Sequence, residues 1–254
     1  MIFSTSATTD KGGRGHNEDY YGYFTEEALA CWVVADGLGG HMGGEVASRF
    51  VTEAVVEKTG GWPEFSDAAI TDIMKKINGD LLSAQNEDVS NRGMKTTVVA
   101  VFYENGTLKY FHTGDSRFYY FKNGAISART KDHSLSQMAV DSGEITYEEI
   151  RFHEDRNVVL RVIGLENYNP EGLVGTISPA PGDAFLLCTD GFWEYVYENE
   201  MEGELALAGS PDEWLASMLA RHGARTPKDN DNFTAVCCFV KEGQAALPGG
   251  AGFV

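Results

Sequence analysis

Basic residues are scarce in this sequence. Its 254 residues include 20 Lys and Arg against 38 Asp and Glu, which gives a formal net charge of −18. A surface of this charge repels a phosphate backbone, so nucleic acid is disfavoured as a partner. The same charge suits basic partners or cations, and it also keeps a protein in solution.

Cysteine is scarce too, and no C-x-x-C pair with zinc-site spacing occurs. Cys31, Cys188, Cys237 and Cys238 each lie in an apolar run, which predicts buried small side chains in strands. The adjacent Cys237 and Cys238 are expected on opposite faces of one strand. Unpaired thiols fit a reducing compartment, so we expect a cytoplasmic protein.

Long apolar runs are absent. No run approaches the roughly 20 residues needed to span a bilayer, and the N-terminal MIFSTSATTDKGG has no apolar core of a signal peptide. We therefore expect no membrane partner. No repeat or linker-like break interrupts the chain, which predicts a single domain over residues 1–242 and a flexible tail over 243–254.

Strand patterns and helix patterns occur in separate blocks. Residues 96–130 alternate in polarity and contain the hairpin dipeptides Asn105-Gly106 and Asn123-Gly124. Strands are also predicted at 29–35, 183–191 and 232–240, and helices at 45–58, 67–86 and from Ser210-Pro211 onward. Blocks without strict βαβ alternation favour an α+β fold with antiparallel sheets.

The stretch RGHNEDYYGYF, residues 14–24, places Arg14 and two carboxylates beside an aromatic run. Such a cluster is costly to desolvate unless a salt bridge, a metal or an anionic ligand compensates it. We expect the aromatic residues to bury the far end of this strand in the sheet core.

Five aspartates share one context, the end of an apolar strand. A single one is usually a turn residue, but five predict a shared site. Crowded carboxylates repel one another, and a cation removes the repulsion; oxygen ligands suit Mg²⁺ or Mn²⁺. The five are Asp19, Asp36, Asp115, Asp190 and Asp231.

Several carboxylates could hold two metal ions about 3.5–4 Å apart. Water bridging such ions becomes a hydroxide that can attack phosphorus in line. The planar guanidinium of Arg14 could hold the phosphate through two hydrogen bonds. These residues therefore predict metal-assisted hydrolysis of a phosphate ester.

An ordered set of nine motifs resembles the metal-dependent protein phosphatases, the PPM or type 2C family. Any one motif is weak, but nine in family order are specific, and DGLGGHMGGE (36–45) resembles bacterial members. The motifs are RGHNED (14–19), VVADGLGGHMGGEVAS (33–48), KTTVVAVF (95–102), HTGDSRFYYF (112–121), TKDHSL (130–135), SGEIT (142–146), LRVIGL (160–165), LLCTDGFWEYV (186–196) and DNFTAV (231–236).

The resemblance implies a four-layer α-β-β-α sandwich with metals between two central antiparallel sheets. It implies two Mn²⁺ or Mg²⁺ ions at the core. Asp36 would bridge both ions, the Gly37 carbonyl would bind one, and Asp190 and Asp231 would hold the first. Asp115 would join Asp190 at a third ion seen in bacterial relatives.

Further roles follow from the same resemblance. Glu18 would act mainly through metal-bound water, and Asp19 would be a ligand or support one. Asn232, beside Asp231, would support the ligands, and Arg14 would bind the substrate phosphate. A flap beside the site would lie within about 135–180.

A general acid is less well defined. Animal relatives carry a His directly after the Asp-Gly pair, where this chain has Leu38. His41, three residues later, and His16 are the candidates, although a lone His in a glycine-rich loop is more often structural.

The resemblance implies a serine/threonine phosphoprotein phosphatase that opposes a Ser/Thr kinase. Two alternatives stay open: a hydrolase of small phosphate esters, and a non-catalytic phosphatase-like sensor or scaffold. A cysteine-based tyrosine phosphatase is disfavoured because it needs a C-x5-R loop, and Glu194 stands at the Arg position after Cys188.

Overall fold

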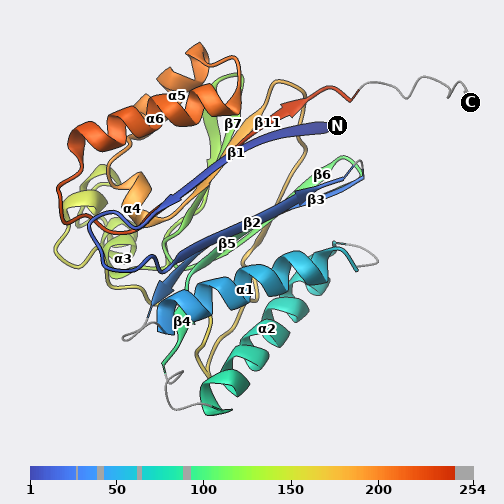
Figure 1. Ribbon diagram of the computed structural model, residues 1–254, viewed down its shortest axis with the longest axis vertical. Coiled ribbons are helices and arrows are strands. Elements are labelled where there is room, and N and C mark those ends of the chain that lie inside the picture. The colour runs from blue at the N-terminus through green and yellow to red at the C-terminus, as the bar shows by residue number, and fades with distance from the viewer. Residues whose placement is uncertain (27, 39–42, 62–64, 88–92, 244–254) are drawn as a thin grey trace, which may run out of the picture.

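Two antiparallel sheets lie face to face in the computed structural model, which describes residues 1–26, 28–38, 43–61, 65–87 and 93–243 (Figure 1). The first sheet has the order β1-β11-β10-β7-β8, with bounds Ile2–Asp10, Phe233–Lys241, Ala184–Cys188, Arg117–Lys122 and Ala125–Arg129. The second has the order β2-β3-β5-β6-β9, with bounds Asp19–Thr25, Leu29–Leu38, Val98–Glu104, Thr107–Thr113 and Val174–Ile177; β4 (Lys95–Thr96) pairs with β3.

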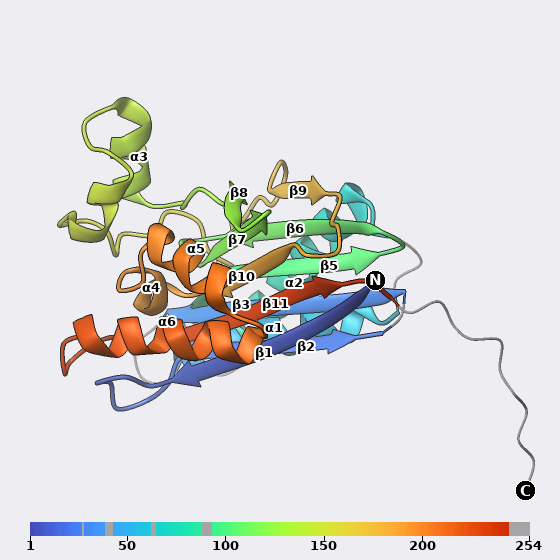
Figure 2. The ribbon, with the colours of Figure 1, turned by 90° about the horizontal axis from the view of Figure 1, so that it is seen from above.

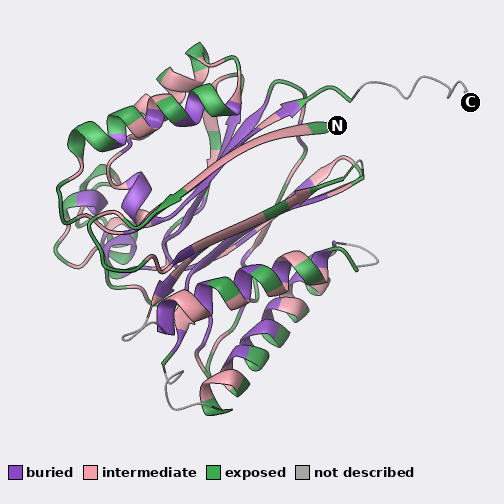
Figure 3. Ribbon diagram, in the orientation of Figure 1, coloured by how far each residue is buried: buried purple, intermediate pink, exposed green. Residues whose placement is uncertain are grey.

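Strand β3 shows why the sheets stack. Its residues alternate between two faces, so Cys31 and Val33 pack toward helices while Trp32 and Val34 pack toward the other sheet. In β11, Cys237 faces the helices and Cys238 faces the second sheet. Both faces of each central strand are therefore apolar, and Figure 3 shows these strands as buried.

Helices cover the two outer faces. α1 (Gly43–Thr59) and α2 (Asp67–Glu87) pack on the second sheet, and α5 (Glu198–Leu207) and α6 (Pro211–Arg225) pack on the first (Figure 1). As predicted, Ser210 caps α6 and accepts a hydrogen bond from the Glu213 N–H. The four-layer α-β-β-α sandwich is confirmed.

The remaining elements lie at one end of the sandwich. α4 (Asp190–Trp193) follows β10 directly. α3 (Leu135–Ser142) projects beyond the strand ends with its neighbouring loops (Figure 2), and a 3₁₀ helix, η2, covers Glu148–Phe152. α3 and η2 lie within the predicted flap region, about 135–180, but β9 in the same region is a strand of the second sheet.

The two predicted hairpin turns are confirmed. Asn105 and Gly106 have φ of 45° and 90°, and Asn123 and Gly124 have φ of 52° and 78°, the left-handed pair that a two-residue turn needs. The two hairpins do not continue into one sheet, because β6 belongs to the second sheet and β7 to the first. The chain crosses between sheets at Gly114–Ser116.

Two expectations were wrong or incomplete. The aromatic run at 20–24 is not buried: β2 is an edge strand, and Tyr23 is 42% exposed. α5 was not predicted, since its sequence ENEMEGELAL buries only Met201 and so lacks an apolar stripe. The cysteines are buried and unpaired, as expected. His41 and residues 244–254 of the predicted tail lie outside the described residues.

The described helices include none that is long and apolar enough to cross a membrane.

Candidate active site

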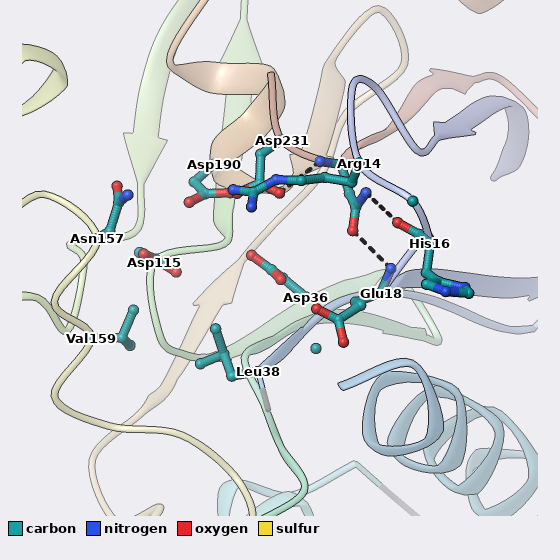
Figure 4. Close-up of a pocket in the computed structure, with 13 residues that line it drawn as sticks. Arg14, His16, Glu18, Asp36, Leu38, Asp115, Asn157, Val159, Asp190 and Asp231 are labelled. Atoms are coloured by element: carbon teal, nitrogen blue, oxygen red, sulfur yellow. Dashed lines mark hydrogen bonds and ion pairs between the residues drawn. The ribbon is translucent and has the colours of Figure 1, made fainter. Parts of the chain in front are cut away.

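A cleft of about 780 Å³ opens at the end of the sandwich where α4 begins (Figure 4). Antiparallel pairing explains why distant segments meet there, since the end of one strand lies beside the start of the next. Asp19 pairs in register with Asp36, and Cys188 pairs with both Arg117 and Ala235. The lining residues are Arg14, Gly15, His16, Glu18, Asp36, Gly37, Leu38, Asp115, Asn157, Val159, Asp190, Asp231 and Asn232.

Four of the five predicted aspartates line this cleft. Figure 4 shows the carboxylates of these four residues directed toward the same space. Asp36 lies in β3, Asp115 in the loop between β6 and β7, Asp190 at the start of α4, and Asp231 two residues before β11. The fifth, Asp19, does not line it but lies buried beside Asp36. The structure therefore brings together all five residues that the sequence grouped.

Asp36 is held through its backbone. Its N–H donates to the Thr97 hydroxyl at 3.0 Å, and its carbonyl accepts from the Thr96 hydroxyl and the Thr97 N–H, both at 2.8 Å. These bonds fix the backbone of Asp36, and the direction of the strand then turns its carboxylate into the cleft. The pair Thr96-Thr97 of the KTTVVAVF motif thus acts as the support of the central carboxylate.

Asp19 is buried with one oxygen unsatisfied. Its Oδ2 accepts from the Thr189 hydroxyl at 2.8 Å, whereas Oδ1 has no hydrogen-bond partner. Burial, with smaller contributions from Asp190 and Asp231, raises the pKa of Asp19 to about 8. Thr189 was missed in the sequence, although its place directly before Asp190 in LLCTDG could have indicated it.

Asp36, Asp115 and Asp190 are also uncompensated. Enclosure and the charge of Asp190 raise the pKa values of Asp36 and Asp115 well above their usual range. Enclosure and Asp231 raise the pKa of Asp190 to about 6. Asp115 Oδ1, like Asp19 Oδ1, has no partner. Such a cluster requires protons or cations to balance its charge.

The donor set fits hard divalent cations. It consists of carboxylates and the carbonyl-bearing backbone at Gly37, which are the ligands that Mg²⁺ and Mn²⁺ prefer. Within the described ranges, no three Asp, Glu, His or Cys side chains already converge on one point as a closed ligand set. The cleft therefore offers oxygen atoms from several walls, and the two unpartnered buried oxygens are what a cation would satisfy.

Arg14 lies at the rim of the cleft. Its Nη2 is 2.9 Å from Asp231 Oδ2, and both side chains are about half exposed (Figure 4). The salt bridge suggested by the RGHNED stretch is therefore present. An exposed ion pair of this kind is weak. It would therefore be a small obstacle to Arg14 pairing with an anion in the cleft instead.

Asn232 fixes the loop that carries Arg14 and Glu18. Its side chain accepts from the Glu18 N–H at 2.8 Å and donates to the carbonyls of Lys11 and His16 at 2.8 and 2.9 Å. The side chain is buried, so all three bonds are shielded from water. Asn232 therefore contacts the backbone of this loop and not the carboxylates themselves.

The glycines near Asp36 permit close backbone approach. A Cβ on Gly37 would lie 2.1 Å from the Gly44 carbonyl oxygen, and one on Gly44 would lie 2.7 Å from Glu18 Oε1. Any larger residue would separate α1 from β3 at the cleft. This is the close approach that the glycine-rich stretch 36–45 predicted.

The remaining lining residues bear on a general acid. His16 is exposed, and in Figure 4 its ring is turned away from the aspartates. Asn157 and Val159 line the cleft from the flap side. Sequence reasoning did not single them out, because nothing in the polar stretch 133–170 marks individual positions.

The family model described as protein phosphatase 2C matches residues 13–227. The serine/threonine phosphatase stp of Listeria monocytogenes serotype 4b is 33% identical over 201 residues, which cover 76% of this chain and 79% of that protein. The chain belongs to the protein phosphatase 2C family.

Solved structures agree with this assignment. The crystal structure of Stp1 from Staphylococcus aureus has a TM-score of 0.85 at 28% identity and covers 95% of this chain and 96% of that one. The catalytic domain of the protein phosphatase PstP, solved in complex with 2 manganese ions, has a TM-score of 0.79 at 27% identity and covers 94% and 99%. The expected family, fold and serine/threonine phosphatase activity are confirmed.

Proposed function

We propose that this phosphatase holds Mn²⁺ or Mg²⁺ in the aspartate cleft and there hydrolyses phosphoserine and phosphothreonine in proteins. The observation that carries the proposal is the cluster of five aspartates, which contains two buried oxygens without partners and in which burial raises the pKa values of Asp19, Asp36, Asp115 and Asp190. Cations would neutralise that charge and make the arrangement stable at neutral pH.

The ligand roles follow the walls of the cleft. Asp36 and the Gly37 carbonyl would hold the central pair of ions, with Asp190 and Asp231 on the first. Asp115 would share a third with Asp190. When bound, such ions lower the pKa of a water and neutralise phosphate charge.

The protein's own groups would orient the substrate and water. Glu18 lies on the loop that Asn232 anchors and would accept hydrogen bonds from water in the cleft. Arg14 would hold two phosphate oxygens, and it would be free to do so if Asp231, its present ion-pair partner, bound a cation instead. No general acid is assigned among the described residues: Leu38 stands where animal relatives carry a His, and His16 faces away.

The wider setting is proposed on the same basis. Residues 1–242 would act as one catalytic domain, and its substrates would be made by an opposing Ser/Thr kinase. Four unpaired buried thiols support a reducing, cytoplasmic location.

The deciding experiment is phosphate release from a phosphothreonine peptide with Mn²⁺ or with EDTA. We expect release only with Mn²⁺ and a loss of about 10²–10³-fold in Asp36→Asn, the scale on which one electrostatic catalytic group acts. Asp183→Asn is the control, since Asp183 is a buried aspartate at the opposite end of β10, where it accepts from Tyr120 and the Ala180 N–H. Equal turnover in EDTA would refute the metal role.

A second experiment tests substrate class and Arg14. Faster turnover of nucleotide or sugar phosphates than of the peptide would instead favour a small-molecule phosphatase. Arg14→Ala should raise KM about tenfold or more through the lost charge-assisted bonds. Arg221→Ala, which breaks a surface ion pair with Glu204 outside the cleft, should leave KM unchanged.

A further inference from the structure

One indole connects two of the cleft aspartates. Trp193 is the last residue of α4, the helix that begins with Asp190, and its Nε1 donates to the Asp115 carbonyl oxygen at 2.9 Å. Trp193 is 1% exposed. The backbones that carry Asp190 and Asp115 are therefore joined through a single buried side chain.

The indole is itself held in place by Arg117. The Arg117 guanidinium carbon lies 3.3 Å from the centroid of the Trp193 ring. The same guanidinium donates from Nε and Nη2 to both oxygens of Asp132, at 2.8 and 2.7 Å. Arg117 is fully buried and Asp132 nearly so, and a paired planar cation stacked on an aromatic ring has little freedom to move.

The flap also contacts Trp193, through its backbone. Arg151 in η2 donates from Nε to the Trp193 carbonyl at 3.1 Å and from Nη2 to Glu198 at 2.8 Å. Trp193 thus has partners in the crossing loop, in β7 and in the flap.

Hydrogen bonds hold the loop that carries Asp115, whereas one oxygen of its carboxylate has no partner. The His133 N–H donates to the Gly114 carbonyl at 2.9 Å, and the hydroxyls of Ser116 and Thr97 are 2.7 Å apart. Gly114 has φ of 103°, with Thr97 Cβ only 2.6 Å from where its own Cβ would be. Against this, Asp115 Oδ1 has no partner.

We propose that Trp193 is a positioning residue, clamped by Arg117, that sets the spacing between the Asp115 and Asp190 carboxylates. Like charges repel, so this pair would separate in a loose framework and lose affinity for a cation between them. The inference rests on the proposed function, in which these two aspartates share one ion. Trp193 would thus strengthen the binding of that ion without touching it.

The test compares two tryptophans. Trp214 is also fully buried, and its Nε1 donates to the Met201 carbonyl at 3.0 Å, between α6 and α5 and away from the cleft. Trp193→Phe and Trp214→Phe each remove one indole N–H bond and keep an aromatic ring. Binding of Mn²⁺ is measured from the electron paramagnetic resonance signal of the free ion, and turnover is measured over a range of Mn²⁺ concentrations.

Trp193→Phe should weaken the weakest Mn²⁺-binding step about tenfold, equivalent to about 1.4 kcal/mol, which is the net worth of one hydrogen bond. Its kcat at limiting Mn²⁺ should fall in parallel, recover at excess Mn²⁺, and leave KM for the peptide unchanged. Asp115→Asn should weaken the same step. Trp214→Phe should lower stability without moving the Mn²⁺ curve.

Equal Mn²⁺ curves for wild type and Trp193→Phe, or equal shifts in both Phe variants, would overturn the inference. If Trp193→Phe does not fold, the proposal is tested on the wild-type protein by nuclear magnetic resonance. During a titration with diamagnetic Mg²⁺, the indole N–H resonance of Trp193 should shift and that of Trp214 should stay; the absence of a Trp193 shift counts against the proposal. Failure of the proposed function would differ, since wild type would then show no metal-dependent turnover.

Discussion

The metal-free phosphatase should lose stability as the pH rises, and Asp19→Asn should remove the part of that loss that comes from Asp19. Asp19 has no cation beside it when the metals are removed, and its Oδ1 is buried without a partner. Asparagine has the same shape and can still accept from Thr189. The substitution therefore removes the charge and keeps the packing.

The magnitude follows from the pKa of Asp19, which is raised from 3.8 to about 8, chiefly by burial. A raised pKa in the folded state means that stability is fully present below the unfolded-state pKa and is lost as the pH rises through the folded-state pKa. Each pKa unit corresponds to about 1.36 kcal/mol. The full window from about pH 4 to about pH 8 therefore costs on the order of 5 kcal/mol, about 3 kcal/mol of it above pH 5.5.

The assay is urea unfolding of EDTA-treated protein at about pH 5.5 and about pH 8. The change in unfolding free energy between the two pH values is compared in wild type and Asp19→Asn. The half-buried His133, whose pKa is lowered to about 3 by loss of contact with water, acts in the opposite direction, because it lowers the stability of the protein as the pH falls. Its contribution is common to both proteins and cancels in the comparison.

Two results would refute this reasoning. The first is a wild type and an Asp19→Asn variant with the same pH dependence. The second is a failure of Mn²⁺ to restore wild-type stability at about pH 8, since a cation bound only by the folded state must stabilise it. Asp183→Asn should lower stability and leave the response to Mn²⁺ unchanged.

Three further predictions, two in the framework of the cleft and one in α2, are checked by urea unfolding. Asn232→Ala should cost about 2–3 kcal/mol, because the Glu18 N–H and the carbonyls of Lys11 and His16 all lose the buried side chain that pairs with them. Gly191→Ala should cost about 1–3 kcal/mol by overpacking, since its Cβ would lie 2.0 Å from the Asn232 carbonyl oxygen. Gly79→Ala, inside α2 with no atom within 4 Å of its Cβ, should stabilise by about 0.5–1 kcal/mol.

These three variants also control one another. The two glycine substitutions add the same methyl group, so opposite signs are required if the space around each Cβ decides the outcome. Asn232→Ala should also reduce turnover, because the loop of Arg14 and Glu18 loses its anchor. Full activity with reduced stability would contradict the role of Asn232 in the cleft.

Much of the candidate site was predictable from local signals. An aspartate at the end of an apolar strand is visible in the sequence, and the stretches around Asp36 and Asp190 carry it with neighbouring glycines. The hairpins at Asn105 and Asn123 were predictable because each turn depends on only two residues. α5 and the half-exposed aromatics of β2 were not, because burial at an edge depends on what lies beside it.

The sequence by itself determined which strands are apolar on both faces, where the chain must turn, and which carboxylates stand at strand ends. Each of these depends on residues a few positions apart. Only the tertiary structure decided that β6 and β7 enter different sheets, that Asn232 holds the loop of Glu18, and that Trp193 and Arg117 join Asp190 to Asp115. Those contacts link residues far apart in the chain, so they exist only after register and sheet packing are set.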